Sequence, residues 1–435
     1  MLLIQNGMLI TMDGPAQAIA DGVVLADGPR IVYAGPRQDA PPAQGAQVLD
    51  AKGGLIMPGL INCHAHTAMT LVRGLADDLP LAQWLNEHIF PVEAKLDGQA
   101  VHWGTMLGCL EMIRGGVTCF NDMYLFAHDV GRAVERSGLR AVIGEVLYDF
   151  PSPCYGPLEN GFKVCAELIE RYKDHPRLKG AVVTHALYTC SRPLMERAGR
   201  LAADAGVDLV IHLAETAVEN ELVLEKWGQR PYEVMEDLGL CGPNLLIDHA
   251  VHLSDAEIRR AAAAGVRVAH CPESNMKLAS GVMPLRRMLA AGLTVGLATD
   301  GCASNNNLDM FEEMDSCAKL CKVSTMDPTA APAAQVLALA TSQAGAAMGM
   351  AGQIGVLKAG ALADVIVIDT DQPHLTPMYN PVSHLVYAAR AADVMHTVCH
   401  GQVLMQDRQL TTIDQDEVLR NFRRCADALT GGKLL

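Results

Sequence analysis

A repeating alternation of apolar strand, polar turn and helix-length segment, which runs through most of the chain after residue 58, constrains the fold more than any other feature. We predict eight strands, at residues 60–64, 117–121, 141–146, 180–185, 207–212, 245–249, 266–270 and 295–300. Helical patterns lie between them, for example at residues 100–114, 162–173, 193–205 and 255–264. Nearly continuous apolar strands are typical of a parallel sheet covered on both faces. Eight such repeats predict an α/β fold, a (β/α)8 TIM-like barrel.

The two ends of the chain have a different pattern, which is typical of β-structure. Short alternating runs at residues 2–4, 23–25, 31–33 and 48–49 are separated by the Asp-Gly pairs at 13–14, 21–22 and 27–28, and such pairs are hairpin signals. After a helical stretch at 332–350, strand-like runs return at 363–369, 394–399 and 402–405, followed by a closing helix at 414–429. We therefore expect residues 1–57 and 355–435 to form one small composite β-sandwich domain beside the barrel at residues 58–354.

Composition excludes several classes of partner. The 435 residues carry 34 basic and 49 acidic side chains, a formal charge of −15, which argues against nucleic acid because phosphate binding needs a basic face. No apolar run approaches ~18 residues, so we expect no membrane span. The 13 cysteines are scattered and odd in number, as expected of small buried hydrophobes in a reducing compartment. The N-terminus lacks the features of a signal peptide, so we expect a cytoplasmic protein.

Side chains that can bind metals stand at the ends of six of the eight predicted strands. The first strand ends in His64 and His66, whose spacing puts both rings on one face of a strand. The later ones end in His185, His212, His249, His270 and Asp300. Barrel enzymes place their sites at the carboxyl ends of the strands. The pattern predicts a metal site there, although any single histidine could instead be a packed core residue.

Several longer motifs resemble those of a known family. They are the run from Pro58 to His66, Ile211-His212-Leu213-Ala214-Glu215-Thr216, Asp248-His249-Ala250-Val251-His252 and Thr299-Asp300-Gly301-Cys302-Ala303-Ser304. These motifs are similar to those of the amidohydrolase superfamily. Residues 69–85, Pro91-Val92-Glu93 and the run from His270 to Gly281 resemble, more narrowly, the methylthioadenosine/S-adenosylhomocysteine deaminases. The resemblance covers nearly the whole chain, including the split β-domain.

The resemblance implies one divalent metal ion per subunit, bound by His64, His66, His212 and Asp300. Imidazole nitrogens with one carboxylate suit zinc, with iron or manganese as alternatives, and leave a position open for water. Two-metal members of the superfamily carry a modified lysine at the end of strand four. Here His185 stands at that position, so we expect a single ion.

The resemblance also implies the catalytic roles. A bound divalent ion can lower the pKa of its water to roughly 7. Glu215 would protonate the ring nitrogen, His249 would orient the water, and Asp300 would accept its proton and pass it to the leaving amine. Each of the two carboxylates also has a purely structural alternative. Glu215 could cap the helix that begins near Ala217, and Asp300 could cap the turn that follows it.

Substrate contacts are expected from residues 67–96, which would form a lid over the barrel mouth. In the resembled family, a glutamate at the position of Glu93 binds the ribose hydroxyls, and a carboxylate can accept from both. His185 would contact the sugar or the ring, and Glu215 and Asp300 would also touch the substrate. Trp84 and Phe90 could pack on the base or on the alkylthio tail, or simply belong to the core.

The chain departs from the family pattern at two places beside the expected pocket. Strand four ends in Thr184-His185-Ala186-Leu187, where relatives commonly show Pro-His-Ala-Pro. Glu145 stands at the end of strand three, where some members have a substrate-binding arginine. Both departures concern the tail of the substrate and not the chemistry at the ring.

The expected activity is the deamination of 5′-methylthioadenosine, S-adenosylhomocysteine or adenosine to the inosine analogue and ammonia. One alternative is a deaminase or hydrolase of a free heterocycle, such as guanine, a pterin or a triazine. Another is a non-catalytic scaffold. We expect His270 to support the site without binding the ion, and His102, His175, His252 and the histidines after residue 373 to be surface or packing residues. The resemblance also implies a homo-oligomer, a dimer or a tetramer.

Overall fold

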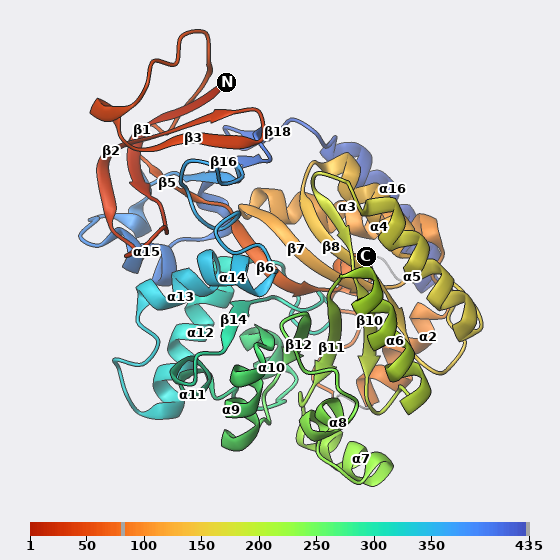
Figure 1. Ribbon diagram of the computed structural model, residues 1–435. Coiled ribbons are helices and arrows are strands. Elements are labelled where there is room, and N and C mark those ends of the chain that lie inside the picture. Colours follow the sequence, from red (N-terminus) through yellow and green to blue (C-terminus); the bar gives the residue numbers. More distant parts are fainter. Residues whose placement is uncertain (80–82, 432–435) are drawn as a thin grey trace.

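Eight parallel strands form the barrel that the sequence predicts (Figure 1). The computed structural model describes residues 1–79 and 83–431. In hydrogen-bonded order the strands are β14 (Thr294–Leu297), β13 (Arg267–His270), β12 (Leu245–His249), β11 (Leu209–Leu213), β10 (Val182–Ala186), β8 (Arg140–Leu147), β7 (Val117–Tyr124) and β6 (Leu60–Ala65), and β9 (Leu178–Gly180) pairs with β8. Every residue of β7 and β8 is buried, as expected of strands covered on both faces.

Helices pack around the barrel, and those between residues 90 and 290 connect its strands. They are α2 (Phe90–Glu93), α3 (Gly98–Arg114), α4 (Ala127–Ser137), α5 (Leu158–Tyr172), α6 (Arg192–Ala205), α7 (Ala217–Trp227), α8 (Pro231–Asp237), α9 (Asp255–Ala264), α10 (Pro272–Lys277), α11 (Leu285–Ala290), α12 (Met310–Thr325), α13 (Ala333–Leu339), α14 (Ser342–Ala347), α15 (Pro381–Tyr387) and α16 (Gln415–Thr430). The lid region contains the 3-10 helix η2 (Thr67–Val72) and the π-helix η3 (Trp84–Ile89). The predicted helical stretch 332–350 is two helices, α13 and α14. None of the described helices is both long and apolar enough to cross a membrane.

Side chains close the seam of the barrel between its first and last strands. The Asn62 amide accepts a hydrogen bond from the backbone N–H of Thr299 (3.0 Å) and donates one to its hydroxyl (2.7 Å). The backbone N–H of Asp300 donates to the carbonyl of His64 (3.1 Å). A side chain at Gly296 would lie 2.3 Å from the Cys63 sulfur, so only glycine permits this approach. The seam therefore holds Asp300 beside His64.

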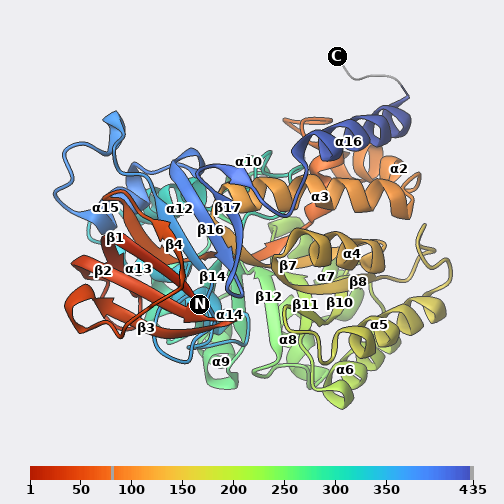
Figure 2. The same ribbon diagram turned by 90° about the horizontal axis from the view of Figure 1, so that it is seen from above.

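The two ends of the chain form one composite sheet, as predicted (Figure 2). Its strand order is β18 (Gln409–Leu410), β17 (Gln402–Gln406), β16 (Val394–Cys399), β15 (Val365–Ile368), β5 (Leu55–Pro58), β1 (Leu2–Ile10), β2 (Ala18–Asp27) and β3 (Arg30–Pro36), and β4 (Gln47–Asp50) pairs with β1. The antiparallel pairing of β15 with β5 joins the two ends. The sheet has its own small apolar core, built from both ends.

In this region one predicted hairpin turn is wrong, and the predicted closing helix lies outside the sheet. Asp21-Gly22 is not a hairpin turn but lies inside β2, where Gly22 is needed because any side chain would meet Cβ of Leu9 at 2.1 Å. The pair Asp27-Gly28 does mark a turn, between β2 and β3. The closing helix α16 packs on α3 of the barrel (Figure 2). The domain limits at residues 57 and 355 remain predictions.

A buried ion pair connects the composite sheet to the barrel. The Arg140 guanidinium of β8 lies 3.1 Å from the carboxylate of Asp364, beside β15, and the two side chains are 4% and 1% exposed. The same carboxylate accepts the backbone N–H of His400 (2.7 Å). Both charges are removed from water, so each depends on the other for compensation.

We predict that Arg140→Met destabilises the protein by about 3–5 kcal/mol, because it leaves the Asp364 carboxylate buried and unpaired. Urea unfolding followed by circular dichroism measures this change. The matched control is Arg287→Met, which breaks the Arg287–Asp255 pair, whose side chains are 60% and 56% exposed. Its expected cost is at most about 1 kcal/mol. Equal losses in the two variants would contradict the importance of the buried pair.

Candidate metal centre and active-site cavity

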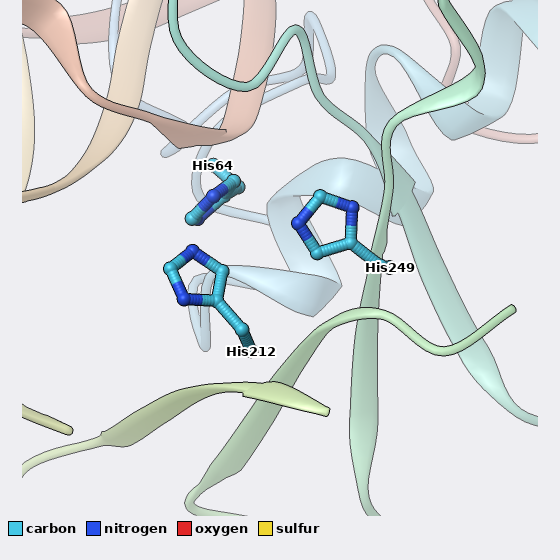
Figure 3. Close-up of side chains that lie close together, drawn as sticks. All are labelled: His64, His212 and His249. Carbon is cyan, nitrogen blue, oxygen red and sulfur yellow. The ribbon is translucent and has the colours of Figure 1, made fainter. Parts of the chain in front are cut away.

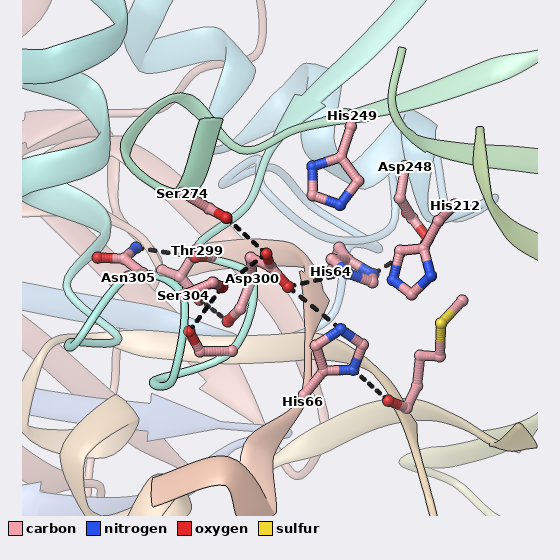
Figure 4. A network of polar contacts seen from close by, with 12 residues as sticks. His64, His66, His212, Asp248, His249, Ser274, Thr299, Asp300, Ser304 and Asn305 are labelled. Atoms are coloured by element: carbon pink, nitrogen blue, oxygen red, sulfur yellow. Dashed lines mark hydrogen bonds and ion pairs between the residues drawn. The ribbon is translucent and has the colours of Figure 1, made fainter. Parts of the chain in front are cut away.

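The histidines predicted at the strand ends converge at the carboxyl end of the barrel (Figure 3). The ring centroid of His64 lies 4.7 Å from that of His66, 5.0 Å from that of His212 and 5.6 Å from that of His249. Asp300, which follows β14, joins them from the other side of the seam (Figure 4). Two groups have potential ligand atoms within 4.8 Å of one another, namely His64, His212 and His249, and His64, His66 and Asp300. The structure thus brings together all four predicted ligands and His249.

Unusual backbone conformations help to aim these side chains. His249 (φ 69°), Asp300 (φ 62°) and Ala214 (φ 54°) all occupy the left-handed region, although none is glycine. Such conformations cost about 1–3 kcal/mol each and persist only where the surroundings impose them. Their concentration at the ends of β11, β12 and β14 is typical of a functional site.

Hydrogen bonds fix which ring nitrogens face the centre. His66 Nδ1 donates to the carbonyl of Met123, and His212 Nδ1 donates to the carbonyl of His185 (2.9 Å). In neutral rings the Nε2 atoms therefore carry lone pairs. His66 Nε2 lies only 3.2 Å from Asp300 Oδ1, and two acceptor atoms at this distance repel unless a proton or a cation lies between them. The donor set fits a cation bound among these atoms.

The charges around His64 support the same conclusion. Its Nδ1 lies 3.1 Å from Asp248 Oδ2 and its Nε2 lies 3.3 Å from Asp300 Oδ1, and the ring is fully buried. Burial disfavours a charged ring, but the carboxylates of Asp248 and Asp300 outweigh it and raise the pKa of His64 to about 10. Burial also lowers the pKa of His212 well below its usual value and keeps that ring neutral. The centre has an excess of negative charge, which a divalent cation would balance.

Asp300 is oriented toward the histidines and does not cap the following turn. Its Oδ2 accepts hydrogen bonds from the hydroxyls of Ser274 (2.6 Å) and Ser304 (2.7 Å), which leaves Oδ1 facing His64 and His66. Burial opposes ionisation, but the two histidines outweigh it and hold the pKa of Asp300 well below its usual range. The carboxylate is therefore a ready ligand.

Glu215 is also free of the capping role that sequence alone allowed. The cap of α7 is Thr216, whose hydroxyl accepts the backbone N–H of Glu219 (3.0 Å). The Glu219 carboxylate in turn accepts the N–H groups of Ala214 (2.9 Å) and Glu215 (2.6 Å), which fixes the loop. The Glu215 carboxylate accepts a hydrogen bond from Ser280 (3.2 Å) and lines the cavity above the histidines.

His249 is held by a side chain from the next loop. Its Nδ1 lies 3.0 Å from Asn275 Oδ1, so it donates there and presents Nε2 to the cavity. His270 is buried and does not line the cavity, and burial, with a smaller effect of His249, lowers its pKa to about 3. His252 donates to the carbonyl of Ser280 (2.7 Å) and serves packing.

A cavity that opens to solvent lies above the centre, between the strand ends and the lid; its space, open solvent included, is about 770 Å³. Glu93, Trp84, Phe90 and His185, the residues predicted to contact substrate, all line it. Glu93 pairs with the Tyr124 hydroxyl, the Trp84 indole donates to the carbonyl of Ala76 (3.1 Å), and His185 Nδ1 lies 2.8 Å from the Thr189 hydroxyl. The predicted lid also includes residues 80–82, which lie outside the described residues.

Sequence reasoning missed several residues that shape the site. They are Asp248, Tyr124, Ser274, Asn275 and Ser304. Four of them, all but Tyr124, lie inside motifs that carried the resemblance, so their position was a signal. Glu145, noted as a departure, is turned away from the cavity and accepts the backbone N–H of Ala127 (2.8 Å) at the start of α4. Burial raises its pKa to about 7.

Comparisons with known proteins agree with this geometry. The model of the amidohydrolase family matches residues 55–404. A protein of Syntrophobacter fumaroxidans named 5-methylthioadenosine/S-adenosylhomocysteine deaminase is 52% identical over 426 residues, which cover 98% of this chain and 97% of that protein. A 5′-deoxyadenosine deaminase of Methanosarcina mazei is 42% identical over 98% of both chains. The crystal structure of an adenosine deaminase from Xanthomonas campestris with bound zinc is similar with a TM-score of 0.95 and 36% identity, over 99% of this chain and 98% of that one.

Proposed function

The chain belongs to the amidohydrolase family, and on this premise we propose that it is a metal-dependent deaminase of 5′-modified adenosines, which yields the inosine analogue and ammonia. One observation carries the proposal. Imidazole lone pairs and the Asp300 carboxylate face one another at the floor of a cavity whose walls include Glu215 and Glu93. This reaction needs a cation at the floor of the cavity and a proton donor beside the purine ring. It also needs a hydrogen-bond acceptor for the two ribose hydroxyls.

We propose that His64, His66, His212 and Asp300 bind one divalent ion, most simply zinc, with iron or manganese as alternatives. The excess of acceptor atoms around His64 supports a divalent ion at this place. The zinc in the related adenosine deaminase structure supports the choice of metal. When bound, such an ion supplies Lewis acidity, which lowers the pKa of a water molecule to about 7.

The chain's own residues would move the protons. Glu215 would donate a proton to the purine nitrogen next to the attacked carbon, which makes that carbon electrophilic. His249, held by Asn275, would orient the attacking water and stabilise the charge that develops on it. Asp300 would accept the water's proton and deliver it to the leaving amine. The amine then departs as ammonia, the hydroxyl left on the ring carbon returns a proton to the ionised Glu215, and the ring keeps the oxygen as a carbonyl.

Residues of the cavity wall would bind the nucleoside. Glu93, at the end of α2, lines the cavity and would accept hydrogen bonds from the ribose hydroxyls. His185 can receive one from the sugar or the ring, since its pKa is lowered to about 4 by burial and the ring is neutral. Trp84 and Phe90 would pack on the base and the substituent. A free base would leave the Glu93 carboxylate without these partners.

We predict that the KM for 5′-methylthioadenosine falls as pH rises from 6 to 8. Burial raises the pKa of Glu93 to about 7, and its bond to Tyr124 only partly offsets this. Below that pH the carboxyl is protonated and can accept only one ribose hydroxyl; above it the ionised carboxylate can accept both. The ionised fraction rises from about one tenth to about nine tenths, so KM should fall severalfold, and by about ninefold at most, because the protonated form still binds through one hydroxyl. Initial rates across this range measure it, and Glu93→Gln should flatten the profile. An unchanged profile in that variant would contradict the role of Glu93.

Ammonia release across a panel of substrates tests the proposed function. We expect kcat/KM for 5′-methylthioadenosine, 5′-deoxyadenosine and adenosine to exceed that for free adenine and guanine by about 100-fold or more. Equal rates on adenine and its thioether nucleoside would contradict the proposal. The absence of bound metal in freshly purified protein would favour the scaffold alternative. The predicted homo-oligomer is tested separately by light scattering.

A further inference from the structure

Glu219, in the first turn of α7, is a buried acidic residue that the proposed reaction does not use. It is only 4% exposed and does not line the cavity directly above the histidines. Acidic side chains are rarely buried to this extent unless they are paired or hydrogen-bonded. The partners of Glu219 therefore indicate what it does.

These partners are two successive backbone N–H groups between β11 and α7. One carboxylate oxygen of Glu219 accepts the N–H of Ala214 (2.9 Å), and the other accepts the N–H of Glu215 (2.6 Å). Successive N–H groups beside a left-handed residue form a concave site that binds anions, and Ala214 is such a residue (φ 54°). The side chain of Glu219 fills this site.

This arrangement differs from an ordinary helix cap. The run Thr216-Ala217-Val218-Glu219 has the pattern of a capping box, in which the glutamate would accept the N–H of the threonine. In the structure Thr216 caps α7 with its hydroxyl, but the Glu219 carboxylate reaches past it to the two residues before it. The carboxylate therefore fixes the turn before the helix.

The fixed turn determines where the Glu215 side chain points. β11 ends one residue before Ala214, and from the turn the Glu215 carboxylate enters the cavity and contacts Ser280 (3.2 Å). The carbonyl of Ala214 also accepts the N–H of His252 (2.9 Å), in the loop after β12. Left-handed conformations of residues other than glycine persist only where their surroundings impose them, and the two bonds to Glu219 help to impose this one.

We infer that Glu219 is a positioning residue for the proposed acid: it holds the turn at Ala214 so that the Glu215 carboxylate faces the purine ring. The inference rests on the proposed function and deepens it. Without the Glu219 carboxylate the turn can relax, and Glu215 is then less often in the position from which it donates its proton. Proton transfer should slow, while metal binding and substrate affinity change little.

The first test is Glu219→Gln. The amide has the size of the carboxyl group, but only its oxygen can accept an N–H, and its nitrogen would face the other N–H with a second donor. We expect kcat for 5′-methylthioadenosine to fall by about 10–100-fold, with KM changed by less than about threefold and the metal content unchanged. An unchanged kcat would overturn the inference.

The conditions and controls follow from the burial of the side chain. Burial raises the pKa of Glu219 to about 8, because the hydrogen bonds from the backbone only partly offset it, so rates are compared at pH 9. Glu221→Gln, an exposed substitution on α7, is the matched control and should leave kcat unchanged. Thermal unfolding shows whether each variant is folded. Glu219→Ala, which buries no amide, is the second variant and should show the same loss of kcat.

A double-mutant cycle shows whether Glu219 acts through Glu215. In a Glu215→Gln background no acid is left to position, so adding Glu219→Gln should lower kcat further by less than about twofold. A general structural role would lower kcat by the same factor in both backgrounds and would overturn the inference.

Failure of the wild-type protein to release ammonia from any adenosine derivative would instead refute the proposed function. The crystal structure of Glu219→Gln would then still test the inference. We expect the turn at Ala214 to change and the Glu215 carboxylate to lose its contact with Ser280. An unchanged turn with Glu215 still on Ser280 would overturn the inference.

Discussion

Replacing Asp300 by asparagine is expected to lower kcat/KM by about 10³-fold or more and to weaken metal binding by about 100-fold or more. The amide keeps the shape of the side chain but removes the negative charge that faces His64 and His66. It also removes the group that would carry the water's proton. Steady-state kinetics with 5′-methylthioadenosine and metal analysis after dialysis measure the two effects.

The control for this variant is Asp315→Asn on α12, far from the histidines in the sequence, where the partly buried carboxylate pairs with the exposed Lys319 (2.6 Å). It should change neither activity nor metal content. An Asp300→Asn protein that kept both its metal and its rate would show that the carboxylate is only part of the turn after β14.

Replacing Glu215 by glutamine is expected to lower kcat by about 10²–10⁴-fold while the metal content stays unchanged. Glutamine can occupy the same space and keep the contact with Ser280, but it cannot donate a proton to the purine and recover it. Because Thr216 caps α7, the loss of the carboxylate should not unfold the helix. Metal analysis and kcat measured on the same preparation separate the two effects.

Glu225→Gln, an exposed substitution on α7, is the matched control and should leave kcat unchanged. Loss of metal together with activity in Glu215→Gln would assign this carboxylate to the metal centre. An unchanged kcat in Glu215→Gln would show that Glu215 takes no part in the reaction.

The positions of the strand-end residues could be predicted because a barrel follows a simple geometric rule. Once eight apolar strands were recognised, their carboxyl ends had to meet, and the side chains there had to surround one space. This explains why His64, His212, His249 and Asp300 could be placed together although up to 236 residues separate them, from residue 64 to residue 300.

Other features could not be read from the sequence because they depend on local backbone geometry. The left-handed conformations at His249 and Asp300 break the alternation of side chains at the strand ends, so Asp248 and His249 both come close to His64. The hydrogen bonds by which the Asn62 side chain closes the seam of the barrel could not be predicted from the sequence either. An asparagine in a buried strand has no sequence signal that identifies its partner.

The choice between a structural and a catalytic role for Glu215 also needed coordinates. Both Glu215 and Thr216 stand where a helix cap can be, and both residue types can accept a backbone N–H. In the structure Thr216 caps α7, and the Glu219 carboxylate accepts the backbone N–H of Ala214 in the loop before the helix. The remaining carboxylate is thus left in the cavity.

Anomalous diffraction from crystals of the purified protein, recorded at the absorption edge of its metal, tests the central claim most directly. The account predicts one peak per chain, within about 2.0–2.2 Å of ring nitrogens of His64, His66 and His212 and of Asp300 Oδ1. His249 should lie outside this shell. A peak bound instead by His64, His212 and His249, two peaks, or none at this place would contradict it.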